Sequence, residues 1–340
     1  MHSIPYRTKQ RIRKGLKAAL IVLGVLALLD ALAIFYLGRY VVYGEDGAHI
    51  VLDRSTARSV DDSELLREPE RQTPEVSIVY ENPGANSGSA ELITGYYIDI
   101  AMLQHPEKVM EALQALDGPC TVMIDLKSSS GSFYYSTSIA GAVTADSIDV
   151  TEVDQIISYL RTNGFTMIAR IEAFRDTEFA LAHIPSGIAT PSGVLWMDRS
   201  GYYWLDPEDS LVQEYLRQIV NELAAKGFSE VVLNDFYFPE SGQIRYTSEK
   251  SRSELMSDTA QSLVEYFRTT KITISFGDPS HDFVLTEPTS HVYLSGVAGS
   301  GVGSAISGYN RLASAQEQLV FLTGSRDTRF ESCNVLRPLL

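Results

Sequence analysis

The chain has 340 residues, 44% of them hydrophobic, with a formal net charge of −15 and only two cysteines. Residues 1–39 hold seven Lys and Arg against one Asp, which leaves −21 on the other 301 residues. This large negative charge on residues 40–340 excludes binding to nucleic acid or to an anionic surface through bulk charge. Cys120 and Cys333 could form one disulfide in an oxidising space, but a scaffold built on disulfides is excluded.

The N-terminus predicts a membrane segment. Six basic residues within the first 17 precede an apolar run from Ala18 to Leu37, which is long enough to cross a bilayer as a helix. We therefore expect a cytoplasmic basic tail at 1–17, a single-pass signal anchor at 18–37, and the remainder outside the cell membrane. The alternative is a cleaved signal peptide, because Ala31-Leu32-Ala33 fits a cleavage site. The apolar run continues through Ile34 to Tyr36, which favours the anchor.

Residues 38–92 predict a short β piece and a linker. Tyr40 to Tyr43 and His49 to Leu52 flank a Gly-Glu-Asp-Gly turn, which is typical of a hairpin. The polar, proline-containing stretch after it resembles a linker, with one further strand expected at Val76 to Tyr80.

Residues 93–340 alternate short apolar strands with helical patterns, and this alternation predicts parallel strands with crossover helices. The length fits a (β/α)8 TIM-type barrel, and a doubly wound open sheet is the alternative. The last third is the least regular, so the barrel could be incomplete there, and the Gly-rich run 298–308 is expected to be a flexible loop. The expected strands are 95–100, 120–126, 166–174, 230–235, 271–276, 291–294 and 319–322, and the expected helices are 106–116, 153–162, 210–226 and 253–269.

Polar side chains follow the strands where each strand ends. In a parallel barrel, such residues and the loops after them form the site. The candidates are Asp125 and Lys127, Arg170 and Glu172, Asn234 and Asp235, and Asp278. For Asp125, Arg170 and Glu172 the alternative is a buried ion-pair network inside the barrel.

Both tryptophans lie in one long loop, 183–209. Trp196 and Trp204 could stack on sugar rings at the mouth of the barrel, since aromatic faces offer large apolar area. The alternative is that they pack the loop onto the barrel. In the same loop, Asp206 or Asp209 is expected to cap the helix that follows.

Five segments in order carry a family resemblance: GYYIDI, VMIDLKSSSG, IARIEAFRD, WLDP and GFSEVVLNDFYFP, within residues 95–239. This chain resembles the bacterial "putative glycosyl hydrolase domain" family, whose members adopt a TIM barrel and often follow an N-terminal membrane segment. Two positions depart from the family pattern. Asn234 stands where the pattern has Asp, and Tyr237 where it has Arg. Asp235 cannot replace the missing carboxylate unless the backbone re-aims it, because neighbours in a strand face opposite ways.

The resemblance implies a glycoside hydrolase-like protein that acts on, or binds, a polysaccharide at the bacterial cell surface. Glycoside hydrolysis uses two carboxyl groups, and we expect Asp235 and Glu172 as the pair, with Asp125 and Asp278 in reserve. A barrel that binds carbohydrate without catalysis and a structural cell-envelope protein are the alternatives. No metal motif or cofactor motif is present in the sequence, and the expected substrate-binding residues are Arg170, Lys127, Trp196, Trp204, Asn234 and Tyr237.

Overall fold

A computed structural model describes residues 41–44, 47–50, 92–281 and 283–340. The chain divides into two compact units, at residues 1–83 and 84–340. In the first, β1 (Val41–Gly44) and β2 (Gly47–Ile50) pair antiparallel, which confirms the expected hairpin. The predicted anchor at 18–37 and the strand expected at 76–80 lie outside the described residues. None of the helices in the described part is long and apolar enough to span a bilayer.

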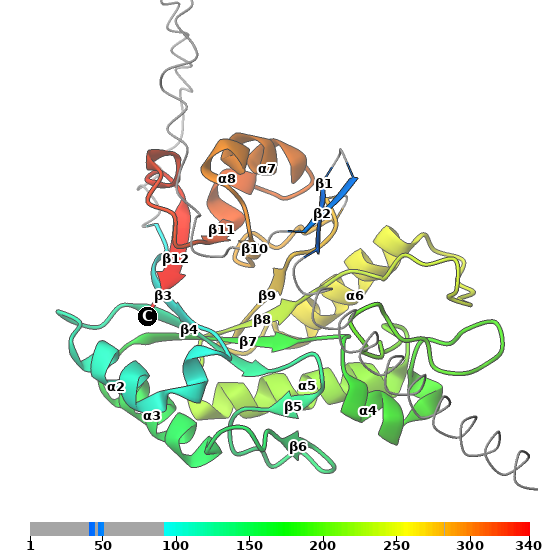
Figure 1. The fold of residues 1–340 in the computed structure, drawn as a ribbon, viewed down its shortest axis with the longest axis horizontal. Coiled ribbons are helices and arrows are strands. Elements are labelled where there is room, and N and C mark those ends of the chain that lie inside the picture. Colours follow the sequence, from blue (N-terminus) through cyan, green and yellow to red (C-terminus); the bar gives the residue numbers. More distant parts are fainter. Residues whose placement is uncertain (1–40, 45–46, 51–91, 282) are drawn as a thin grey trace, which may run out of the picture. The chain divides into compact units, whose positions relative to one another are not determined.

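The second unit is a closed barrel of eight parallel strands, each hydrogen-bonded to two neighbours (Figure 1). The first strand pairs with both the second and the last, so the ring of eight parallel strands has no open edge and a doubly wound sheet is excluded. In order around the ring, the strands are β3 (Thr94–Ile98), β4 (Thr121–Lys127), β7 (Thr166–Glu172), β8 (Glu230–Asn234), β9 (Thr273–Gly277), β10 (Val292–Ser295), β11 (Leu319–Leu322) and β12 (Asn334–Pro338).

Helices pack on the outer face of the third, fourth and fifth strands of the ring. α3 (Val150–Thr162) packs on β7, α5 (Ser210–Lys226) on β8, and α6 (Arg252–Phe267) on β9, while α2 (Pro106–Gln114) packs on α3. Local chemistry sets their ends. The Asp209 carboxylate accepts from two backbone N–H groups at the start of α5, as expected of a cap, and Gly227 ends that helix at a φ of 101°. Ser251 and Glu254 form a reciprocal capping box at the start of α6.

The last third departs from a regular barrel, as expected, but it is not incomplete. The eighth strand, β12, was not expected from the sequence, and it closes the ring. The Gly-rich run at 298–308 is not a loop, because it forms the 3-10 turn η5 (Gly299–Gly301) and the helix α7 (Val302–Gly308). α7 and α8 (Ala315–Gln318) are much shorter than α5, so the outer face is covered less regularly here.

The short β5 (Ser132–Phe133) and β6 (Val143–Thr144) lie between β4 and α3. Between β7 and α5 run α4 (Thr177–Ala182) and the 3-10 turn η4 (Ile184–Ser186). Two further 3-10 turns are η3 (Met102–Gln104) and η6 (Thr328–Phe330).

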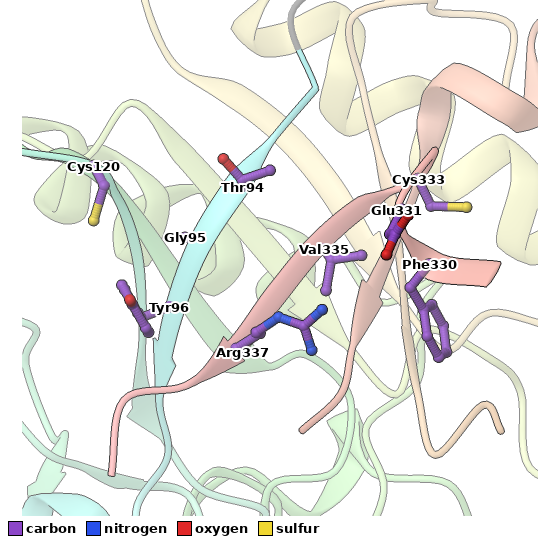
Figure 2. A pocket seen from close by; sticks show the side chains of 9 residues that line it. All are labelled: Thr94, Gly95, Tyr96, Cys120, Phe330, Glu331, Cys333, Val335 and Arg337. Carbon is purple, nitrogen blue, oxygen red and sulfur yellow. The ribbon is translucent and has the colours of Figure 1, made fainter. Parts of the chain in front are cut away.

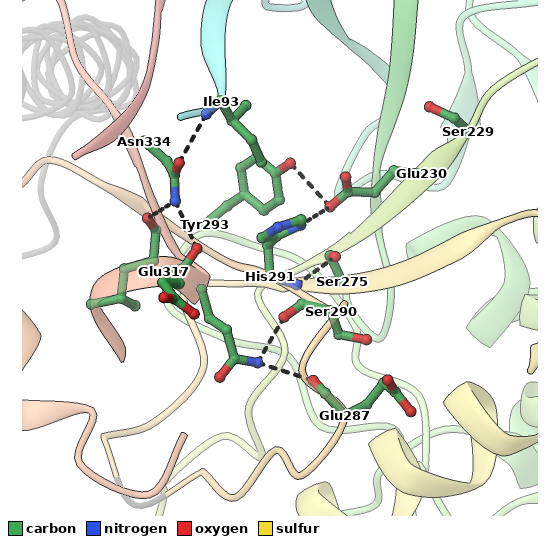
Figure 3. Close-up of polar contacts among 12 residues, drawn as sticks. Ile93, Ser229, Glu230, Ser275, Glu287, Ser290, His291, Tyr293, Glu317 and Asn334 are labelled. Atoms are coloured by element: carbon green, nitrogen blue, oxygen red, sulfur yellow. Dashed lines mark hydrogen bonds and ion pairs between the residues drawn. The ribbon is translucent and has the colours of Figure 1, made fainter. Parts of the chain in front are cut away.

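The barrel interior is apolar in its middle and polar at both ends. A buried cluster fills the middle, composed of Met123, Ile168, Val232, Tyr293, Val320, Leu322 and Leu336. At the N-terminal end of the strands, the Glu230 carboxylate accepts from the Tyr293 hydroxyl at 3.0 Å and lies 3.1 Å from Nδ1 of His291 (Figure 3). Asn334 accepts from the backbone N–H of Ile93 and so joins the last strand to the first. This end therefore holds the ring together.

Candidate active site

Asp125 and Arg170 form a tight ion pair at the C-terminal end of the barrel. They lie opposite each other on β4 and β7. Nε and Nη2 of Arg170 donate to the two carboxylate oxygens of Asp125 at 2.6 and 2.7 Å. A bidentate pair of this kind uses both oxygens of the carboxylate. The geometry therefore favours the buried ion-pair alternative for these two residues.

Lys127 also has a structural partner. Its Nζ lies 2.8 Å from a carboxylate oxygen of Asp176, and both side chains are fully buried. The same ammonium donates to the backbone carbonyl of Glu172 at 2.7 Å. The Asp176 carboxylate accepts further bonds from the N–H of Phe179 and the hydroxyl of Tyr215. Lys127 is thus enclosed by the protein, which argues against the substrate-binding role predicted for it.

Glu172 has one engaged carboxyl oxygen and one free one. Oε1 accepts from Nδ2 of Asn234 at 2.8 Å, whereas Oε2 is buried without a hydrogen-bond partner. Burial, and then the negative charge of Asp235, raise the pKa of Glu172 to about 7. The Asn234 hydrogen bond and the charges of Lys127 and Arg170 oppose that rise. A carboxyl group that titrates near neutrality can give up a proton as a general acid.

Asp235 and Asp278 share an unusual backbone conformation. Each directly follows a strand, β8 or β9, and their φ values are 48° and 44°. Non-glycine residues rarely adopt this left-handed conformation, and Asp is among those that tolerate it best. It interrupts the alternation of the strand, which is how Asp235 and Asn234 both contact residues of β7 or its following loop. Burial raises the pKa of both aspartates.

Arg175 connects Asp235 to the long loop that follows β7. Its Nη1 lies 2.9 Å from Asp235 and its Nε 3.2 Å from Asp198. The guanidinium lies over the ring of Trp204 at 4.9 Å, and the indole N–H of Trp204 donates to Asp198 at 2.9 Å. Neither Arg175 nor Asp198 is among the site residues predicted from the sequence. The only available signal was a cation placed three residues after the strand, in the segment IEAFR.

A cavity of about 570 Å³ opens beside this cluster. Volumes of this size are typical of small-ligand sites. Its lining includes three expected binding residues, Trp196, Trp204 and Tyr237, together with Arg175. Trp196 and Trp204 are buried, so they also pack the loop as the alternative had it. Asp125, Glu172, Asp235 and Asp278 do not line this cavity, and Asp235 is joined to it through Arg175.

A second cavity, of about 410 Å³, lies by the N-terminal ends of the strands (Figure 2). It contains both thiols, Cys120 before β4 and Cys333 before β12, and neither is in a disulfide. β3 runs between those two strands. Two strand spacings amount to about 9.6 Å, beyond the reach of a disulfide. Within the described ranges, this cavity included, no group of three or more His, Cys, Asp or Glu is arranged to hold a metal ion.

Comparisons with known proteins identify a family. The family model described as "Putative glycosyl hydrolase domain" matches residues 95–277. No curated protein matches the chain.

Several solved structures are similar in backbone. A hypothetical protein from Ruminiclostridium thermocellum is 21% identical, with 54% of this chain and 96% of that chain covered and a TM-score of 0.44. A chitobiase from Flavobacterium johnsoniae is 14% identical over 68% of this chain and 38% of its own, with a TM-score of 0.43. A β-N-acetylhexosaminidase from Bacteroides fragilis is 10% identical over 68% and 50%, with a TM-score of 0.47.

Proposed function

Because this chain belongs to the glycosyl hydrolase-like family whose model covers more than half of it, we propose that it hydrolyses a polysaccharide, with Glu172 and Asp235 as its two carboxyl groups. The observation that carries this proposal is the state of Glu172. Its Oε2 is buried without a partner, and its pKa is raised to about 7, mainly by burial. A structural carboxylate would normally have both oxygens satisfied.

The two carboxyl groups differ in environment, as acid and base roles require. Glu172 holds its proton near neutrality and serves as the acid that protonates the departing sugar oxygen. Asp235 is buried too, but the Arg175 guanidinium at 2.9 Å favours its ionised form. Asp235 is then the nucleophile or the base that activates water, and the separation between the two groups decides which.

The cavity beside Arg175 is the proposed sugar-binding region. Trp196, Trp204 and Tyr237 supply aromatic surface for sugar rings. The indole N–H of Trp196 is buried and has no acceptor, so the hydroxyl oxygen of a bound sugar could accept its hydrogen bond.

The proposal includes the predicted location. With the apolar run Ala18–Leu37 as a signal anchor, the barrel faces the outside of the cell, where bacterial polysaccharides lie. Protease added to intact cells should then digest the barrel and spare the basic tail. Sequencing of the mature N-terminus separates the alternatives, because a start at Ile34 means that the segment is cleaved.

Carbohydrate binding without catalysis is the second candidate, and Asn234 favours it, because an amide cannot act as a carboxylate nucleophile. The test is to incubate the full-length chain with a panel of cell-wall and plant polysaccharides and to count new reducing ends. Hydrolysis that disappears in Asp235→Asn and Glu172→Gln, but persists in Glu111→Gln on the exposed face of α2, supports the enzyme. Binding without new reducing ends supports the second candidate, and neither binding nor hydrolysis refutes both.

A further inference from the structure

Asn234 is the residue that most weakens a catalytic reading of the sequence, yet it is also the residue most closely tied to Glu172. The two lie opposite each other in the register of β7 and β8. Nδ2 of Asn234 donates to Oε1 of Glu172 at 2.8 Å. Among the residues that the structure describes, this is the only hydrogen bond to the Glu172 carboxyl group.

The amide of Asn234 packs against the backbone of the next strand, β9. Gly277 on β9 lies so close that a Cβ atom there would be 2.4 Å from Oδ1 of Asn234 and 3.1 Å from its Cα. The φ of Gly277 is not in the left-handed region, so glycine is needed at this position for space and not for backbone conformation. The carbonyl side of the amide therefore packs on Gly277 and its N–H₂ side faces Glu172.

We propose that Asn234 is a positioning residue that engages Oε1 of Glu172 and thereby leaves Oε2 as the oxygen that carries the acid's proton. A neutral carboxyl group has one O–H donor and one free carbonyl oxygen. Because the amide N–H needs an acceptor, Oε1 is the carbonyl oxygen and the proton belongs on Oε2. The placement of the proton on Oε2 does not depend on the proposed function. Only the transfer of that proton to the departing sugar oxygen rests on it.

An aspartate at position 234 would act differently. An ionised aspartate has no proton to donate, so the two carboxyl groups would have to share one. Glu172 would then titrate as part of a pair with two apparent pKa values. The amide of Asn234 does not compete with Glu172 for a proton. Asparagine at this position is therefore compatible with a catalytic role for Glu172.

Other charges act on Glu172 without a hydrogen bond to its carboxyl group. Asp235 follows β8 and disfavours ionisation, whereas Lys127 on β4 and Arg170 on β7 favour it. Asp278, which follows β9, acts on Asp235 and Arg170. These charges set how readily the proton leaves, while Asn234 sets which oxygen it leaves.

The test follows the infrared band of the protonated Glu172 carboxyl in the full-length chain as the pH is varied. The band is assigned by its loss in Glu172→Gln. The Asn234→Leu variant keeps the branched shape of the side chain but removes the donor, so the titration midpoint should rise by about one to two pH units. The band itself should also move, because Oε1 no longer accepts a hydrogen bond. Asn234→Asp should give two titration steps, the upper one above the wild-type midpoint.

Hydrolysis measured on the same variants separates this role from the proposed function. If the chain is a hydrolase, the alkaline limit of its activity should shift with the Glu172 midpoint, and Asn234→Asp should not gain activity. If no variant hydrolyses any polysaccharide, the infrared result still decides the role of Asn234. An unchanged midpoint and band in Asn234→Leu, or a gain of hydrolysis in Asn234→Asp, overturns the proposal. Should Asn234→Leu not fold, Gly277→Ala displaces the amide without deleting it and must also move the band.

Discussion

Replacing Glu172 with glutamine should raise the free energy of unfolding relative to wild type, and this difference should grow as the pH rises above the ordinary pKa of a glutamate. The cause is the cost of ionising a buried carboxyl group whose Oε2 has no partner. Glutamine carries no charge at any pH, and its carbonyl oxygen can still accept the bond from Asn234. The variant therefore removes the titration and keeps the contact.

The size of the effect follows from two pKa values. The ordinary value for a glutamate is 4.5, and burial raises the pKa of Glu172 to about 7 in the folded state. Between those values the folded state binds more protons than the unfolded state, so the free energy of unfolding falls as pH rises. At 1.36 kcal/mol for each pKa unit, the loss is about 3 kcal/mol by pH 8 and absent at pH 4. Relative to wild type, Glu172→Gln should gain that amount over the same range.

Urea unfolding of the full-length chain at a series of pH values, followed by tryptophan fluorescence, measures this difference. Glu111→Gln, on the exposed face of α2, controls for loss of a negative charge. The reasoning is refuted if the difference between wild type and Glu172→Gln stays constant from pH 4 to pH 8. It is also refuted if Glu111→Gln follows the same curve.

Three further predictions concern the same barrel. Lys127→Met leaves a fully buried carboxylate without its cation and should lower the free energy of unfolding by about 3–5 kcal/mol in urea. Gly277→Ala brings a methyl group within 2.4 Å of Oδ1 of Asn234 and should cost about 1–3 kcal/mol in the same assay. Cys120 and Cys333 directly precede two strands that a third strand separates, so both should react with a thiol reagent after unfolding without reductant.

Matched variants control these three tests. Lys250→Met breaks an exposed ion pair and should change stability little. Gly118→Ala adds a methyl group where nothing lies within 4 Å. For the thiols, Cys120→Ser should halve the reaction. A stable Lys127→Met, a Gly277→Ala as stable as Gly118→Ala, or an unfolded chain without reactive thiols would contradict the respective account.

Much of the barrel could be predicted because buried parallel strands are continuous apolar runs. Val231 to Leu233 is such a run, and polar residues follow it directly. β12 (Asn334–Pro338) was missed because Arg337 and Pro338 occupy two of its five positions. Residues 334–338 form a strand because they pair with β11 on one side and with β3 on the other.

The site was predictable in its residue types but not in its contacts. Sequence periodicity predicted that Arg170 and Glu172 face the same way, but it could not reveal that both carboxylate oxygens of Asp125 would accept hydrogen bonds from Arg170. Alternation also argued that Asp235 would face away from Asn234. The left-handed backbone overturns that argument, and no residue pattern marks it, because Asp adopts this conformation only in a suitable context.

The backbone at Asp235 and Asp278 has a practical consequence for mutagenesis. Alanine at either position would remove a carboxylate and also impose a conformation that alanine resists, by about 1–2 kcal/mol. A loss of activity or expression in an alanine scan would then confound chemistry with folding. Asparagine tolerates the conformation and glycine adopts it freely. Those two replacements therefore test the loss of the carboxylate without adding backbone strain.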